Sequence, residues 1–327
     1  MPDTTPGGRR TLVTLLVPAY NEADNAGPLV DFFHEIRVAY PDTDFELVLV
    51  DDGSEDGTAR VVLDALAPGD VARVASLSRN FGSHAGISAG LQLARGDVAI
   101  TLSADLQEPI DLIGRFLEEW RGGSDIVWGI RSVRAVKRGP ANLMSRAFSR
   151  IFHRYSDIPT YPPEGPSQIL VARPAIDAVN AMPERNRNVL GMVAWVGFRQ
   201  STIAFEQLPR PAGKSKWTGR KKMKLVMDSF VEFSSAPMRG ALYLGILLGA
   251  LGLLALLATG VVALATWSTP SGLAALAGLV LVLSGGQLAL LGLMGEYLWR
   301  TADEARERPV YVVRSVTDVG EPHRAGT

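Results

Sequence analysis

The segment FELVLVDDGSEDGT, residues 45–58, contains the pattern that decides the fold. Its first six residues form a short, largely apolar run, which predicts a buried strand over Phe45–Val50. Acidic residues and glycines follow, and a helical pattern then extends over Thr58–Leu66. A strand, a polar loop and a helix in this order predict one unit of an α/β sheet.

The same alternation extends through residue 130. Further strands are predicted over Thr11–Val17, Val71–Leu77, Val98–Leu102 and Ile126–Gly129, and further helices over Ala23–Tyr40, Ala85–Ala94 and Ile110–Trp120. Short buried strands that alternate with helices indicate a mostly parallel sheet covered on both faces. The predicted fold is therefore α/β and Rossmann-like, in a domain over residues 1–210. A further strand is predicted over Phe198–Phe205.

Polar residues follow each of the first four predicted strands. The segments are Pro18-Ala-Tyr-Asn-Glu22, Asp51-Asp-Gly-Ser54, Ser78-Arg-Asn-Phe-Gly82 and Ser103-Ala-Asp-Leu-Gln107. Any one of them alone is compatible with a helix cap or a turn. Because ligands of such sheets bind at the carboxyl ends of the strands, four polar ends on one edge predict a binding site. The chain has neither a GxGxxG nor a GxxxxGK[ST] segment, so nicotinamide and P-loop sites are not predicted.

Residues 240–295 contain no Asp, Glu, Lys, Arg or His. A membrane-spanning helix needs about 20 apolar residues, so this run has room for two. Pro270 and Gly272 interrupt it, which predicts a transmembrane hairpin of two helices, Ala241–Trp267 and Leu273–Trp299. The alternative, two core helices of a soluble protein, would need protein cover on every side.

Basic residues flank the two predicted spans. Residues 209–224 include lysines and arginines but no acidic residue, and Arg300, Arg306 and Arg308 follow the second span. The positive-inside rule then predicts a multi-pass protein of the cytoplasmic (inner) membrane, with the α/β domain and both termini in the cytoplasm. Residues 211–239 would form a basic juxtamembrane region that contacts anionic membrane lipids, residues 240–299 the spans, and residues 300–327 a cytoplasmic tail.

Composition excludes several classes of protein. The 327-residue chain has no cysteine, which excludes disulfides, iron–sulfur clusters and thiolate zinc sites. Residues 1–10 are polar, and the apolar run that follows is short and ends at Pro18, so no signal peptide is predicted. No nucleic-acid partner is expected. Glycines in both predicted spans favour a homo-oligomer.

Six segments resemble one enzyme family. They are LVPAYNE (16–22), LVLVDDGSEDGT (47–58), RNFGSHAGISAGL (79–91), SADLQEP (103–109), GKSKW (213–217) and GEYLWR (295–300). They are similar to family 2 glycosyltransferases, in particular to the polyprenyl-phosphate branch, and the resemblance covers nearly the whole chain. It implies a GT-A catalytic domain, a UDP- or GDP-sugar donor, a Mg²⁺ or Mn²⁺ ion, and transfer with inversion onto a polyprenyl phosphate for modification of cell-envelope glycans.

The resemblance also assigns roles to residues near the donor. Asp105 and Gln107 would be the metal ligands, and their oxygen atoms suit a hard divalent cation. Pro18, Tyr20, Glu22, Asp52, Ser103 and Asp105 would bind the nucleotide sugar. An Asp52 carboxylate that accepts from a ring N–H suits uracil and guanine equally, so the base stays open.

The acceptor phosphate is assigned to basic residues. Arg131 matches the family's phosphate-binding arginine, and Lys214, Ser215 and Lys216 match its GxSK segment, while Arg146 on a predicted helix is a further candidate. A phosphate monoester has a second pKa of about 6 and is already largely a dianion at neutral pH, so it needs little general-base assistance. The site must instead hold the phosphate and align it. Asp105, Arg131 and Ser167 are the predicted catalytic residues.

Two positions depart from the family pattern. Ser103 stands where most relatives have the first Asp of Asp-x-Asp, and Ser167 and Gln168 stand where relatives usually have an Asp. Three interpretations follow: an active enzyme, an enzyme with a changed donor or acceptor, or a catalytically weak membrane scaffold or regulator.

A processive polysaccharide synthase is a fourth class, which two spans and the lack of a QxxRW segment argue against. A two-span enzyme would leave translocation of its product to a separate flippase.

Overall fold

The computed structural model describes residues 10–132, 161–162, 166–182, 188–208, 272–306 and 308–321, together with the single positions 247, 254, 258, 261, 264 and 265. The chain divides into two compact units. The first is an α/β unit that takes in the residues from Pro309 onward, and the second includes Met223–Arg308.

The α/β unit is built on an eight-stranded sheet with the order β7-β5-β6-β4-β1-β2-β3-β8. The strands are β1 (Leu12–Ala19), β2 (Asp44–Asp51), β3 (Ala72–Leu77), β4 (Val98–Thr101), β5 (Ile126–Arg131), β6 (Gln168–Ala172), β7 (Gln200–Phe205) and β8 (Val313–Val319). β1 pairs in parallel with β2 and β4, β2 with β3, and β5 with β7, while β6 and β8 run antiparallel to their neighbours. The predicted α/β fold with a mostly parallel sheet is confirmed.

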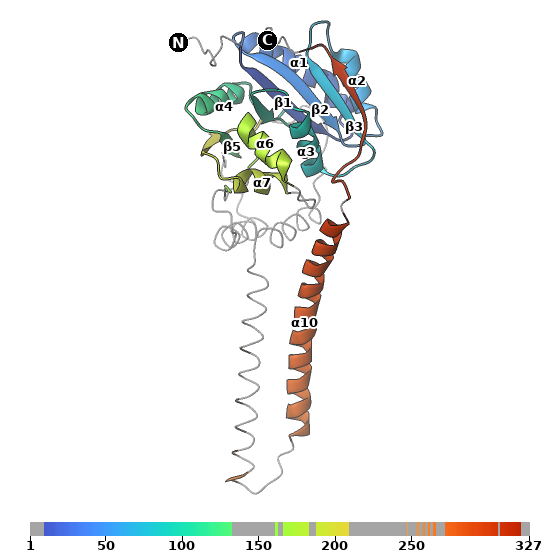
Figure 1. Cartoon of the computed structure of the whole chain (residues 1–327), viewed down its shortest axis with the longest axis vertical. Coiled ribbons are helices and arrows are strands. Elements are labelled where there is room, and N and C mark those ends of the chain that lie inside the picture. Colours follow the sequence, from blue (N-terminus) through green and yellow to red (C-terminus); the bar gives the residue numbers. More distant parts are fainter. Residues whose placement is uncertain are drawn as a thin grey trace. The chain divides into compact units, whose positions relative to one another are not determined.

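Helices cover both faces of this sheet (Figure 1). They are α1 (Ala23–Ala39), α2 (Thr58–Ala65), α3 (Ser83–Leu93), α4 (Asp111–Arg121), α6 (Arg173–Ala181) and α7 (Val189–Trp195). Alternate side chains of β2 pack on opposite faces of the sheet. Leu47 and Leu49 belong to the apolar cluster that includes residues of α1 and α4, whereas Val48 and Val50 pack with Ala89 of α3. At Gly90 a Cβ atom would lie 2.5 Å from Leu16 Cγ, so α3 lies close against β1.

The last strand comes from the region that the sequence analysis described only as a tail. β8 lies antiparallel to β3, with Ala72 opposite Val319 and Ser76 opposite Ser315. The Asp318 carboxylate lies 2.7 Å from Arg73 Nε on β3, which fastens the two strands side by side. Residues from the C-terminal region therefore complete the sheet next to β3.

The second unit contains the long helix α10 (Leu273–Ala305) of 33 residues, which begins at the residue that the sequence predicts. Among the residues that the structure describes, no helix meets the length and hydropathy expected of a membrane span. The predicted span over Ala241–Trp267 lies outside the described residues except for six single positions, and the basic region 211–239 lies entirely outside them.

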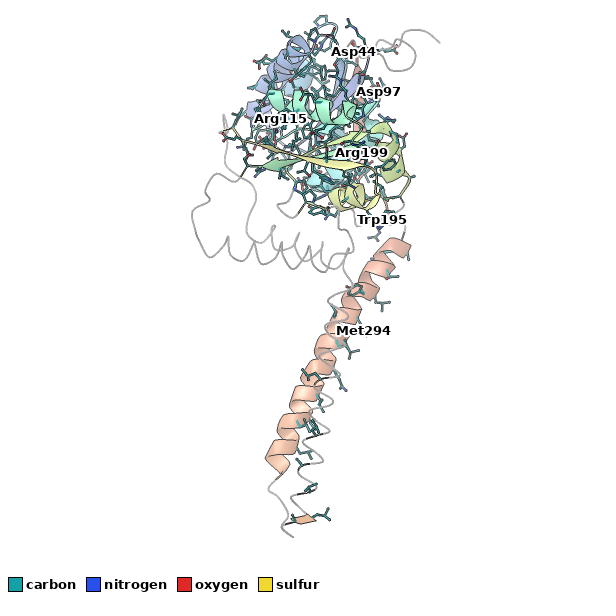
Figure 2. The ribbon with its side chains drawn as sticks, turned by 90° about the vertical axis from the view of Figure 1, so that its left-hand side faces the viewer. Asp44, Asp97, Arg115, Trp195, Arg199 and Met294 are labelled. Carbon is teal, nitrogen blue, oxygen red and sulfur yellow. The ribbon has the colours of Figure 1, made fainter. Side chains whose placement is uncertain are left out.

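Carboxylates at the amino-terminal edge of the parallel strands stabilise turns. Asp44 and Asp97 lie near each other at this end of the sheet (Figure 2), and Asp97 Oδ2 accepts from Leu12 N at 2.9 Å. Buried Glu46 accepts from Arg95 N at 2.6 Å and from Gly96 N at 3.1 Å. Burial raises the pKa of Glu46, and the hydrogen bonds from the Thr14 hydroxyl and from Gly96 N oppose that rise. The carboxylates of this edge thus have structural partners.

Candidate active site

Hydrogen bonds connect the loops after β1 and β2 at the carboxyl edge of the sheet. Asn21, which has a φ of 53°, donates from its backbone N–H to Ser54 Oγ at 2.8 Å, and its Oδ1 accepts from Glu55 N at 2.9 Å. Glu22 N donates to Thr58 Oγ1 at 2.9 Å. The two segments that carry the predicted nucleotide-binding residues are therefore brought together.

Asp52 joins the loop after β2 to the loop after β3. Its buried carboxylate accepts from Phe81 N at 2.7 Å through Oδ1 and from Gly82 N at 2.8 Å through Oδ2. Burial raises the pKa of Asp52, and the two backbone hydrogen bonds oppose the rise. Because each carboxylate oxygen has a second acceptor position, Asp52 retains the capacity to accept from a bound base.

Gly53 makes this junction sterically feasible. It has a φ of +71°, and a Cβ atom there would lie 2.4 Å from the carbonyl carbon of Arg79. The loop after β3 also holds a cation–π contact, with the Arg79 guanidinium 4.0 Å from the centroid of the Phe81 ring. Arg79 is an exposed cation at the predicted nucleotide edge that the sequence analysis did not single out.

The predicted metal ligands Asp105 and Gln107 lie in one loop between β4 and α4. Leu106 between them has a φ of 54°, which is uncommon for a residue with a branched side chain. Gln107 Oε1 accepts from Gln207 Nε2 at 2.7 Å, and Leu208 N donates to the Gln107 carbonyl at 2.9 Å. Hydrogen bonds therefore connect this loop to the segment that follows β7.

The donor chemistry of this loop fits the predicted cation. Asp105 offers carboxylate oxygens and Gln107 an amide oxygen, and Mg²⁺ typically takes one or two such ligands and leaves its other positions to phosphate and water. Within the described ranges, no three His, Asp or Glu side chains gather into a metal-binding group. The assignment of Asp105 and Gln107 stays a prediction.

Ser103 belongs to a buried polar network at the base of the same loop. Its hydroxyl donates to Glu108, and its backbone N–H donates to Glu108 Oε2 at 3.2 Å. Gln168 Nε2 donates to Ser103 Oγ at 2.8 Å and also to Glu108. The other end of this amide, Gln168 Oε1, accepts from Thr101 Oγ1 at 3.0 Å. Glu108 is only 1% exposed, and burial raises its pKa against the opposing hydrogen bonds from Ser103 and Gln168.

Glu108 is not among the predicted site residues, and in the sequence it belongs only to the SADLQEP segment. Its importance depends on β6, a strand that was not predicted.

Two predicted catalytic residues meet beside this network. Arg131, the last residue of β5, donates from Nε to Ser167 Oγ at 3.0 Å, and Ser167 N donates to the Gly129 carbonyl at 2.8 Å. The other predicted phosphate-binding residues, Arg146, Lys214, Ser215 and Lys216, lie outside the described residues. Arg131, which is exposed, is therefore the one predicted phosphate-binding residue within the described part of the chain, and its role stays a prediction.

An aromatic pair involves β5, the strand that ends at Arg131. Tyr161 packs against Trp128 of β5, with the ring centroids 6.1 Å apart. Burial raises the pKa of Tyr161 to about 12, so its hydroxyl stays protonated at neutral pH. The arrangement as a whole offers acceptors for a nucleotide at Asp52, oxygen ligands at Asp105 and Gln107, and a cation at Arg131.

Comparison with known proteins identifies the class of protein to which this fold and these residues belong. A model of glycosyl transferase family 2 matches residues 14–172. The chain belongs to glycosyl transferase family 2. It is 33% identical to an uncharacterized glycosyltransferase of Synechocystis sp., over 92% of this chain and 94% of that protein.

More specific names occur among the other relatives. The prophage bactoprenol glucosyl transferase homolog of Escherichia coli is 31% identical over 93% of this chain and 99% of its own length. The bactoprenol glucosyl transferase of Shigella phage SfV is 30% identical over 93% of this chain and 98% of its own. Among solved structures, one match is a mannosyltransferase from Pyrobaculum calidifontis in complex with GDP-Man and Mn²⁺. The match has a TM-score of 0.48 and 19% sequence identity, and it covers 90% of this chain and 87% of that chain.

Proposed function

We propose that the protein transfers a sugar from a UDP- or GDP-sugar to a polyprenyl monophosphate at the cytoplasmic face of the cytoplasmic membrane. The observation that carries the proposal is the placement of Arg131 against Ser167 on the same sheet edge as Asp52 and Asp105. The names of the bactoprenol glucosyl transferases, which align over nearly the whole chain, support this choice of acceptor.

The donor half of the site consists of the loops after β1, β2 and β4. Asp52 is positioned by the two backbone N–H groups of Phe81 and Gly82 and accepts from the base. Asp105 and Gln107 would hold a Mg²⁺ or Mn²⁺ ion, which when bound neutralises charge that develops on the departing diphosphate. Leu106, between these two residues, has a φ of 54°.

The acceptor half of the site orients a phosphate. Arg131 binds the phosphate monoester of the lipid, while Ser167 fixes the guanidinium through Nε and leaves its terminal N–H groups for the phosphate oxygens. A phosphate oxygen then attacks the anomeric carbon from the side opposite the nucleotide. The new bond joins the sugar to the lipid phosphate, the bond to the diphosphate breaks, and the nucleoside diphosphate leaves with the electron pair. No protein base has to remove a proton, because the attacking phosphate is largely a dianion.

The membrane part of the proposal rests on residues 240–295 and their basic flanks. Among the described side chains of α10, five large apolar ones are exposed, namely Leu276, Val280, Leu291, Met294 and Leu298, and Figure 2 shows Met294 projecting from the helix. Lipid would cover such a surface. The proposal therefore includes the hairpin, with the α/β unit in the cytoplasm and a separate flippase that moves the product across.

A donor panel tests the proposal. The full chain is purified in detergent and incubated with undecaprenyl phosphate, Mg²⁺ or Mn²⁺, and a set of UDP- and GDP-sugars, and the lipid is analysed by mass spectrometry. We expect one sugar to appear on the lipid phosphate and the product to disappear in Asp105→Ala. Binding of a nucleotide sugar without a lipid product from any donor would contradict the proposal and favour a scaffold or a changed acceptor.

A further inference from the structure

The loop that carries Asp105 and Gln107 is closed by Glu108. The Glu108 carboxylate accepts both the hydroxyl and the backbone N–H of Ser103, so the chain from Ser103 to Glu108 forms a ring held at its base. Leu106 N also donates to the Ser103 carbonyl, at 3.3 Å. The two predicted cation ligands lie within this closed segment, so its closure sets their separation.

The closure offsets a strained backbone. Leu106 has a φ of 54°, in a region that costs an L-residue other than glycine roughly 1–2 kcal/mol. Strain of this size persists only where neighbouring contacts fix the conformation. The partly buried hydrogen bonds between Ser103 and Glu108 supply such contacts.

Glu108 also connects the closed loop to the acceptor side. Gln168 Nε2 donates to both Glu108 and Ser103, and the next residue toward the N-terminus is Ser167, which holds Arg131. One buried carboxylate thus links the loop with the cation ligands to the residue pair that would hold the lipid phosphate. Within the described residues, its hydrogen-bond donors are the Ser103 hydroxyl and N–H and the Gln168 amide, which are all neutral.

We propose that Glu108 is a positioning residue that closes the Asp105–Gln107 loop for a divalent cation and fixes this loop relative to Ser167 and Arg131. The inference rests on the proposed function, because it assigns a role toward the cation and the nucleotide of that same site. Glu108 acts through Ser103 and Gln168, with which it forms hydrogen bonds.

The hydrogen-bond pattern predicts which substitutions fail and which one rescues. In Glu108→Gln, one of the two positions now occupied by oxygen becomes an NH₂ group, which faces either Ser103 N or Gln168 Nε2, donor against donor. The exchange Glu108→Gln with Gln168→Glu removes this conflict. The new amide at position 108 donates to the new carboxylate at position 168. That carboxylate also accepts from Thr101 Oγ1 and from the Ser103 hydroxyl.

The test measures cation binding by thermal stability rather than by turnover. The full chain in detergent is saturated with UDP or GDP and titrated with Mn²⁺, and the midpoint of the rise in Tm is recorded. Changes in the residues that orient metal ligands typically weaken metal affinity about 10- to 100-fold, so we expect Glu108→Gln to raise the Mn²⁺ midpoint by that factor. The exchange variant should return the midpoint toward the wild-type value.

Glu46→Gln is the matched control, because Glu46 is also a buried carboxylate that accepts backbone N–H groups, but at the opposite edge of the sheet. It should lower Tm without moving the Mn²⁺ midpoint. If Glu108→Gln does not fold, Ser103→Ala, which removes only the hydroxyl, should still raise the midpoint.

An unchanged midpoint in Glu108→Gln, or an exchange variant as impaired as the single one, overturns the inference. So does a wild-type protein whose Tm does not respond to Mn²⁺. The proposed function fails separately, if the Mn²⁺ response is present but no lipid product forms with any donor.

Discussion

Arg131 and Ser167 meet across the β5–β6 pair, with Arg131 Nε 3.0 Å from Ser167 Oγ. The contact arises because β5 and β6 run antiparallel with Gly129 opposite Gln168, which places Ser167 next to the end of β5. Ser167 thereby holds the guanidinium of this exposed side chain through Nε, and the terminal N–H groups take no part in that contact.

We expect Arg131→Lys to impair transfer to the lipid, although the charge is kept. An ammonium group does not reproduce two parallel hydrogen bonds to a phosphate, and hydrogen bonds to charged groups contribute enough to predict a loss of about 10- to 100-fold in kcat/KM for undecaprenyl phosphate. Affinity for UDP or GDP should be unchanged. Arg115→Lys is the control, because Arg115 bonds the Ala204 carbonyl from α4. A parallel loss of nucleotide affinity would contradict the assignment.

We expect Asp52→Asn to weaken nucleotide binding and to lower Tm. The carboxylate accepts from Phe81 N and Gly82 N, whereas an asparagine has one acceptor oxygen and turns an NH₂ group toward the other N–H. A buried donor without an acceptor costs about 1–3 kcal/mol. We expect the loop after β3 to shift away from Asp52 to relieve this cost, and nucleotide affinity should then fall roughly tenfold or more. Isothermal titration with UDP and GDP measures this. Asp31→Asn, at an exposed position of α1, should leave both quantities unchanged.

The sequence predicted the parallel part of the fold because its signal is local. Each of β1 to β5 is a short apolar run followed by polar residues, and β2 was predicted over Phe45–Val50 and found over Asp44–Asp51. The polar strand ends then followed from topology, since parallel neighbours end at the same edge. Asp52 and Asp105 are therefore at the edge where the sequence analysis placed them.

The antiparallel additions were not predictable in the same way. β6 inserts between β4 and β5 although it follows β5 in the chain, and β8 returns to β3 from beyond α10. The β8 sequence, VRSVTDV, mixes polar and apolar residues because most of its side chains are exposed, so no buried pattern marks it. The role of Glu108 depends on Gln168 of β6, a contact between residues 60 positions apart that no spacing reveals.

We expect Gly53→Ala to be far more damaging than Gly57→Ala. Both glycines have positive φ, at +71° and +82°, so alanine costs roughly 1–2 kcal/mol of backbone strain at either position. At Gly57 a Cβ meets nothing within 4 Å, whereas at Gly53 it lies 2.4 Å from the backbone of Arg79. Gly53→Ala must therefore push the loop after β3 away from Asp52. Thermal unfolding and UDP or GDP titration compare the two, and equal losses of Tm would show that the loops separate without cost.

His84 lies in the first turn of α3. Its Nδ1 is buried and has no hydrogen-bond partner within the described ranges, and burial lowers its pKa from 6.5 to about 4. The folded protein therefore holds the ring neutral, while the unfolded chain protonates it near pH 6.5. Because the unfolded state binds this proton more strongly, the stability that the neutral ring contributes is fully present above pH 6.5 and is lost as the pH falls toward about 4.

His84→Gln removes this titration and isolates its effect. Between about pH 7.5 and about pH 5, the wild-type protein should lose about 2 kcal/mol more than the variant, since each unit of linked pKa shift is about 1.4 kcal/mol. Thermal unfolding of both proteins in the same detergent at the two pH values measures the difference in Tm. Other groups titrate equally in both proteins, so they cancel in the comparison. Parallel Tm curves for wild type and His84→Gln would mean that the folded protein accepts a proton on His84 as readily as the unfolded chain does.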